Sequence, residues 1–142
     1  MATANAATTY LENKLLSFIF KNNAGSFSTP GDSIYVGLAT AVSDAEAGSL
    51  TEATFGSYAR QQVTAANWTL ASSSADQQTI KNAANIEFPA STGTTNTVTH
   101  AFIVDAASSG NILFIGALDA SKTIATGDIF RINASNLTIE LK

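Results

Sequence analysis

The stretch VTHAFIV-DAASSGN-ILFIGAL, residues 98–118, indicates the class of fold. Its two apolar segments, Val98–Val104 and Ile112–Leu118, have the length and the β-branched and aromatic content of strands. The small polar residues between them are typical of a hairpin connection. Further short strands are predicted on either side of this hairpin, at Ile34–Leu38, Tyr58–Val63, Ile86–Phe88, Ile129–Ile132 and Leu137–Lys142.

Together these segments predict a mainly β protein. About seven or eight short strands, with turn signals every 8–12 residues or so, favour an antiparallel β-sandwich or a partly open barrel. Ala41–Phe55 and Ser91–Asn96 are predicted to be loops, and Ser72–Asp76 a turn. We expect a single domain over residues 1–142, with an N-terminal arm at 1–9, a helix at 10–21 and the β domain at 33–142.

One helix is predicted ahead of the strands, at Tyr10–Phe20. Thr9 and Glu12 have the spacing of a capping box, in which each side chain satisfies a backbone N–H of the first turn. An apolar stripe with helical spacing follows, made of Leu11, Leu15, Phe18 and Ile19. We expect this stripe to pack on the β domain.

The composition excludes several classes of function. Only 13% of the residues are charged, about half the usual share, and the net charge is −4. The seven Lys and Arg residues are scattered, which argues against direct nucleic-acid binding. Cysteine is absent, so disulfides, zinc–thiolate sites and thiol catalysis are excluded. We expect neither a secretory signal nor a membrane span, and hence synthesis in a cytoplasm.

No catalytic, metal or cofactor site is predicted. His100 is the only histidine, and Asp105 is expected on the opposite face of the strand, so His100 is interpreted as a structural, hydrogen-bonded residue. Asp44, Glu46 and Glu52 lack the spacing of a calcium loop and are interpreted as a solvated acidic loop. An aromatic group, Phe55, Tyr58 and Trp68, is assigned to the core rather than to an exposed interface.

The N-terminal arm is the candidate interface. Met1–Thr9 is small, uncharged and weakly committed to any structure. We expect it to add a strand to an exposed sheet edge of a neighbouring protein or sister subunit, with a frayed terminus as the alternative. The candidate interface residues are Ala2, Thr3, Ala4, Asn5, Ala6, Ala7 and Thr8.

An ordered set of segments resembles a family of small structural proteins of tailed bacteriophages, often labelled tail fibre or virion structural proteins. The segments are TYLENKLL at 9–16, IYVGLAT at 34–40, SYARQ at 57–61 with Asn67-Trp68, NAANIEFP at 82–89, VTHAFIVD at 98–105, GNILFIGAL at 110–118 and GDIFRI at 127–132. The resemblance spans nearly the whole chain. It implies a non-enzymatic component of the virion, made in the bacterial host, with no cofactor.

The position on the virion is left to physical argument. A fibre shaft is usually long and repetitive, and this chain shows neither a repeat nor a heptad. We therefore expect a capsid cement, or decoration, protein that binds the major capsid protein, with a homotrimer favoured. A tail fibre or tail adaptor component, which would bind tail proteins, is the alternative. A carbohydrate- or receptor-binding β-sandwich is a second alternative.

Overall fold

The computed structural model describes residues 5–22, 34–73 and 77–141. It is mainly β with one helix near the N-terminus, as predicted, and its strands curl into an antiparallel half-barrel. The elements are β1 (Ala6–Ala7), α1 (Thr9–Phe20), β2 (Tyr35–Asp44), β3 (Ser49–Glu52), β4 (Gln61–Gln62), β5 (Trp68–Ser73), β6 (Gln77–Asn82), β7 (Ile86–Glu87), β8 (Asn96–Val104), β9 (Ile112–Ile124), β10 (Arg131–Ile132) and β11 (Thr138–Leu141).

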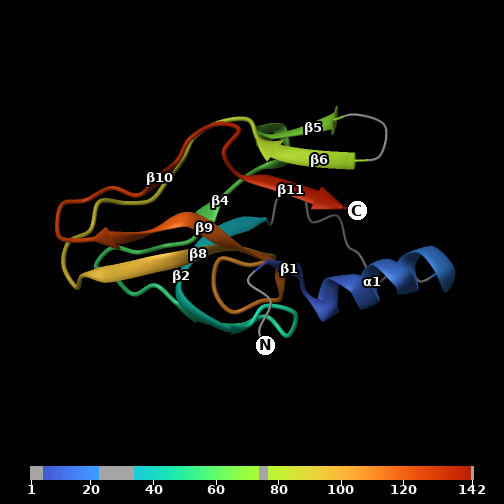
Figure 1. The fold of residues 1–142 in the computed structure, drawn as a ribbon, viewed down its shortest axis with the longest axis horizontal. Helices are drawn as coiled ribbons and strands as arrows, with labels where there is room; N and C mark the ends of the chain where they lie inside the picture. Colours follow the sequence, from blue (N-terminus) through green and yellow to red (C-terminus); the bar gives the residue numbers. More distant parts are fainter. Residues whose placement is uncertain (1–4, 23–33, 74–76, 142) are drawn as a thin grey trace.

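The described strands belong to three sheets. The largest has the order β1-β9-β8-β2-β3, and β4 also pairs with β2. A second sheet has the order β11-β6-β5, and β7 pairs with β10. Figure 1 shows the β5–β6 hairpin and β11 beside the main sheet, with α1 lying apart from both. All of the pairings are antiparallel.

The predicted hairpin at 98–118 is confirmed as β8 and β9, which pair along most of their length. β9 continues beyond the predicted end to Ile124, with a register shift between the Val98 and His100 pairs. Two other predicted strands are shorter than expected. Tyr58–Val63 keeps only β4, and Ile129–Ile132 keeps only β10.

The prediction of a loop at Ala41–Phe55 was wrong. β2 continues through Asp44, and the chain returns as β3 after a tight turn in which Gly48 has a φ of +70°. Small residues interrupt the apolar alternation here, so the period-two signal fades while the backbone pairing persists. β6 was also not predicted, because its sequence QQTIKN holds a single large apolar residue.

The main sheet has apolar packing on both faces. One cluster contains Val36, Leu38, Ala53, Phe55, Val63, Ile86, Phe88, Val98, Ala101, Ile103, Ile124 and Ile132. The other contains Ala39, Ala45, Phe102, Val104 and Ile115. The core assignment of the aromatic group is confirmed. Phe55 is buried, and Tyr58 and Trp68 pack against the first cluster.

Gly37 is required where β2 faces β8. It stands directly opposite Phe102, and a Cβ placed on Gly37 would lie 2.3 Å from the Phe102 Cζ atom. The Phe102 ring therefore occupies the space that any other residue at position 37 would need, and Phe102 itself is 1% exposed.

The helix begins at Thr9, and its N-cap is Thr8 rather than the predicted Thr9. The prediction that its apolar stripe packs on the β domain was wrong. No residue of α1 is buried, and Leu15, Phe18 and Ile19 remain 38%, 46% and 57% exposed. The spacing of the apolar residues correctly indicated a helix, but it carried no information about what covers them.

Candidate protein interface

Helix α1 exposes apolar side chains around much of its circumference. Besides the predicted stripe, Leu16 is 54% and Phe20 77% exposed. At about 100° per residue, the apolar positions from Leu11 to Phe20 cover an arc of roughly 200°, interrupted by Glu12 between Ile19 and Leu16. A helix this apolar is normally covered on more than one side. An isolated helix of this length is marginal in water. The surface of α1 therefore has the properties of a protein-docking element.

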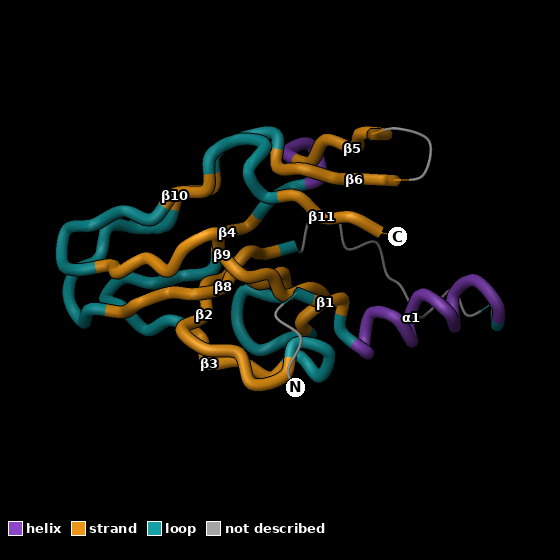
Figure 2. Tube along the Cα trace, in the orientation of Figure 1, coloured by secondary structure: helices purple, strands orange, loops and turns teal. Residues whose placement is uncertain are grey.

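The start of α1 is held firmly on the main sheet. Thr8 is 2% exposed; its backbone N–H donates to the Leu113 carbonyl at 2.9 Å and its hydroxyl to the Ile112 carbonyl at 2.6 Å. The Thr8 hydroxyl oxygen also accepts from the Leu11 N–H at 3.4 Å, and the Thr9 N–H donates to the backbone carbonyl of Glu46 at 2.8 Å. These bonds anchor the start of α1 on the main sheet, and Figure 2 shows the helix extending away from the strands.

The N-terminal arm forms a strand on an edge of its own sheet. β1 pairs with β9, Ala6 opposite Ile115 and Ala7 opposite Phe114, and the Asn5 side-chain oxygen accepts from the Ala117 N–H at 2.6 Å. In the structure, Ala6 and Ala7 therefore pair with a strand of their own chain, whereas the prediction had this segment pair with a partner's sheet. Ala2, Thr3 and Ala4 lie outside the described residues, and their role in binding a partner stays a prediction.

A groove of about 800 Å³ runs between β9 and the C-terminal strands β10 and β11. Its apolar lining includes Phe114, Leu118, Phe130, Leu137, Ile139 and Leu141, and its rim carries Asp119, Lys122, Arg131 and Glu140. This groove was not predicted, because only the curl of the sheets brings β9 beside β10 and β11. The only available signal was the alternation of Leu137, Ile139 and Leu141 in the last strand.

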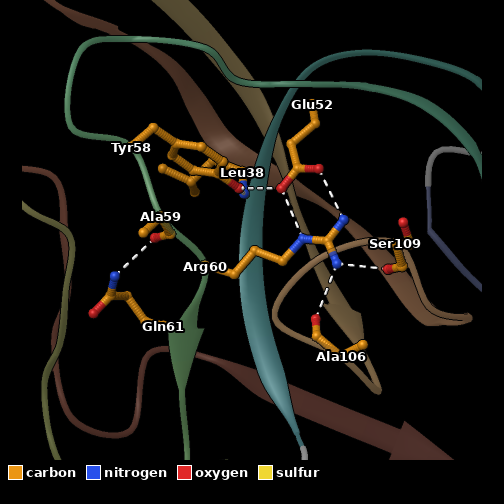
Figure 3. A network of polar contacts seen from close by, with 8 residues as sticks. All are labelled: Leu38, Glu52, Tyr58, Ala59, Arg60, Gln61, Ala106 and Ser109. Atoms are coloured by element: carbon orange, nitrogen blue, oxygen red, sulfur yellow. Dashed lines mark hydrogen bonds and ion pairs between the residues drawn. The ribbon is translucent and has the colours of Figure 1, made fainter.

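The densest polar site is centred on Arg60 (Figure 3). Arg60 Nε and Nη2 donate to the two carboxylate oxygens of Glu52, each at 2.8 Å. Arg60 Nη1 donates to the carbonyls of Ala106 at 2.9 Å and Ser109 at 2.7 Å. Tyr58 donates to Glu52 at 2.8 Å and accepts from the Leu38 N–H at 3.0 Å. This site ties β3, β2 and the β8–β9 connection together.

Glu52, Tyr58 and Arg60 shift one another's pKa values. Burial raises the pKa of Glu52, but hydrogen bonds from Arg60 and Tyr58 outweigh it and the pKa is lowered overall. Burial, reinforced by the Glu52 carboxylate, raises the pKa of Tyr58, and the hydrogen bond to Glu52 raises that of Arg60. No member is poised to exchange a proton near neutral pH, so the arrangement suits structural stabilisation.

Glu52 therefore does not belong to a solvated acidic loop, contrary to the prediction. Asp44 accepts from the Ala47 N–H at 3.2 Å in the turn after β2, and Glu46 is exposed. Within the described parts of the chain, no three acidic or histidine side chains gather where they could hold a metal ion.

His100 lies on β8, and its Nδ1 atom is 2.8 Å from the Thr99 hydroxyl. It faces Ala39 on β2 and Ala117 on β9, neither of which can act as a catalytic partner. Burial lowers the pKa of His100, which favours the neutral form of its ring. The sequence predicts His100 in phase with Val98 and Phe102, but the register shifts between Val98 and His100, and Val98 packs in a different core cluster from Phe102.

Among the helices that the structure describes, none has the length and apolarity needed to cross a membrane. A family model described as "Podophage GP4 fiber I protein gp80" matches residues 6–140. The match covers all but the first five and the last two residues of the chain. A search of curated proteins found no match.

Proposed function

Because the chain belongs to the family of the podophage GP4 fiber I protein gp80, we propose that it is a non-enzymatic fibre subunit of a tailed-phage virion. Its task is to bind other virion proteins and hold them in place. The family is one of phage structural proteins, and the polar site at Arg60 serves the fold rather than a reaction.

The observation that carries this proposal is the uncovered apolar surface of α1. Large side chains such as Leu16, Ile19 and Phe20 are more than half exposed. Because these side chains are already partly covered, full burial by a partner would contribute more than half of the about 1.5–3 kcal/mol of a fully exposed one. Since exposed apolar patches mark interaction sites, α1 fits a subunit whose final environment is an assembly.

The family description favours the fibre over capsid decoration. The lack of a repeat argues against a long shaft, and a short fibre subunit needs none. Capsid decoration, with the major capsid protein as partner, is the competing proposal. A homotrimer is the proposed state in either case.

Counting and locating the protein on purified virions tests this proposal. Quantitative staining should give some tens of copies at most, and gold-labelled antibodies should mark the tail region. Hundreds of copies spread over the capsid would instead establish decoration. Virions that lack the protein altogether would overturn both proposals.

A further inference from the structure

We propose that β5 pairs edge to edge with β5 of a second copy of this chain, which joins the three-stranded sheets of the two copies. β5 is the last strand of the order β11-β6-β5, and no described strand pairs with its other side. Figure 1 shows it on the outer side of its hairpin, away from the main sheet. An uncovered edge offers backbone N–H and C=O groups to a strand of another molecule.

β5 lacks the features that normally protect an edge strand. Natural edges carry charged residues, proline or bulges, or are very short. The sequence of β5, WTLASS, has no charge and no proline, and its pairs with β6 follow one another without a register shift. By contrast, β1 has two residues, and the edge strands β3 and β11 each contain a glutamate. β5 is therefore the described edge best suited to receive another strand.

Alternate residues of β5 direct their backbone groups away from β6. The Ala83 N–H donates to the Asn67 carbonyl at 2.7 Å, so the residues of β5 that bond to β6 have odd numbers. The backbone groups of the even-numbered residues, Trp68, Leu70 and Ser72, therefore face the open edge.

The position of Leu70 favours a second copy as the partner. In an antiparallel pairing about a two-fold axis at Leu70, the two Leu70 residues exchange hydrogen bonds, and each Ser72 N–H donates to the Trp68 carbonyl of the other copy. The Trp68 N–H takes no part, because it already donates to the Ala65 carbonyl. A register centred on Ala71 offers as many bonds, but only the first places the Leu70 side chains, each 71% exposed, opposite one another. The edge is thus complementary to itself.

This pairing would extend an apolar row across both copies. Ile80 on β6 stands opposite Leu70 on one side and opposite Ile139 on the other, so the three side chains share one face of the sheet. Charge does not oppose the contact. The Lys81 residues of the two copies would lie on strands three spacings apart, about 14 Å, which exceeds the Debye length of about 8 Å.

The contact is small and two-fold. A ladder from Trp68 to Ser72 buries less than the roughly 1,200 Å² of a stable specific interface, so we expect a dimer that is weak in dilute solution. It would fill where many copies are held close together, as in an assembly. Because both copies use the same surface, the contact cannot lie between copies of one three-fold trimer. It would join a copy in one trimer to a copy in another.

Single cysteines can trap this contact even when it is weak, because the chain contains no other thiol. Opposite residues of an antiparallel pair have Cα atoms about 4.5–5.5 Å apart, within the range of a disulfide, whereas diagonal residues are about 7–8 Å apart. With oxidised glutathione, Leu70→Cys should form a disulfide dimer at least about tenfold faster than Thr69→Cys, whose thiols would be diagonal. Both positions are exposed on the same strand, so Thr69→Cys is the matched control.

An equimolar mixture of Thr69→Cys and Ala71→Cys tests the register. These two positions would stand opposite one another, so the mixed disulfide should form faster than either symmetric one. Contact between Leu70 side chains without strand pairing would link Leu70→Cys but would give no excess of the mixed disulfide. That result, or equal rates for Leu70→Cys and Thr69→Cys, overturns the inference.

Circular dichroism checks that each variant is folded, and non-reducing gels measure the disulfide dimers. The assay uses purified protein alone, so its failure is distinct from a failure to find the protein at the tail.

Discussion

The Arg60 site and helix α1 use their side chains in opposite ways. At Arg60 every charged or polar group finds its partner within the chain: the guanidinium meets Glu52 and two carbonyls, and Tyr58 meets Glu52 and Leu38. Along α1 several large apolar side chains stay partly exposed, from 38% at Leu15 to 77% at Phe20. The first region is complete in a single chain, whereas on the proposed function the second is completed by another protein of the virion.

This difference separates stability from function. Changes in the completed part should lower the free energy of unfolding of one copy. Changes on α1 should leave that free energy nearly unchanged and should alter association instead. Five substitutions or conditions test this distinction, from the largest expected effect on folding to the smallest.

Gly37→Ala should have the largest effect. The added Cβ would lie 2.3 Å from the ring of Phe102, which is enclosed in the core. We expect a loss of about 3 kcal/mol in urea unfolding, or insoluble protein. Gly93→Ala is the control, because nothing lies within 4 Å of its added Cβ. Equal stability of the two variants would show that β2 and β8 are not packed as described.

Arg60→Met should cost nearly as much. It leaves the partly buried Glu52 carboxylate and the carbonyls of Ala106 and Ser109 without their donor, and we expect a loss of about 3 kcal/mol. Arg131→Met is the matched control. Its ion pair with Glu87 is about half exposed, so it should cost under about 1 kcal/mol. Similar losses of unfolding free energy for Arg60→Met and Arg131→Met would show that the Arg60 site stabilises the fold no more than an exposed ion pair does.

Thr8→Ala should come next, at about 1–2 kcal/mol. It removes the N-cap of α1 and the bond from the buried hydroxyl to Ile112. Thr9→Ala is the control, because Thr9 is exposed inside the helix and does not cap it. Thermal unfolding of both variants measures the two losses of stability. A larger loss for Thr9→Ala would show that Thr9 is the N-cap, as predicted from the sequence. Deleting residues 1–8, which removes Thr8, should likewise destabilise the domain.

Acidification should give a smaller, graded loss. The pKa of Glu52 in the folded chain lies below its ordinary value of 4.5, so its ionised form favours folding. The contribution is fully present above about pH 4.5 and is lost as the pH falls through the lower folded value. Urea unfolding from pH 6 to pH 3 measures it. Glu52→Gln should reduce the change in the free energy of unfolding between pH 6 and pH 3. If that change were the same in the variant and the wild type, Glu52 would not be its source.

Leu15→Asp should have the smallest effect on folding. If the stripe were buried on the β domain, as predicted from the sequence, this change would prevent folding. Since Leu15 is 38% exposed and α1 contains no buried residue, we now expect a change under about 1 kcal/mol. Association should weaken in the same variant. An unfolded Leu15→Asp protein would show that α1 packs on its own β domain and would remove the contrast between the two regions.

Sequence reasoning predicted the parts of the fold in which local pattern and tertiary structure agree. The β8–β9 hairpin has dense β-branched and aromatic residues around a polar turn, and α1 has strong helical spacing. β3 and β6 escaped prediction because their pairing is carried by the backbone while their side chains are small or polar. The phase of His100 was misjudged in part because a register shift leaves no signal in composition.

The candidate interface was harder to predict than the fold. Apolar periodicity indicates that one face of an element is buried, but it does not indicate whether the covering surface belongs to the same chain or to another protein. The groove joins β9 to strands that follow in the chain, and only the curl of the sheets brings them together. Arg60 was predicted to lie in a strand but comes just before β4, and its pairing with Glu52 depends on β2 and β3, which were predicted in part as a loop.

The attachment of α1 at Thr8 also has a mechanical consequence. A pulling force on the N-terminal end of the helix would enter the sheets at Thr8 and Thr9. From there the load would divide between β9, through Ile112 and Leu113, and the turn after β2, through Glu46. β1 pairs with β9 at only two residues, so little else would share the load. A subunit tethered by its helix should therefore yield first at this junction, and the core around Phe102 should remain intact while the tether gives way.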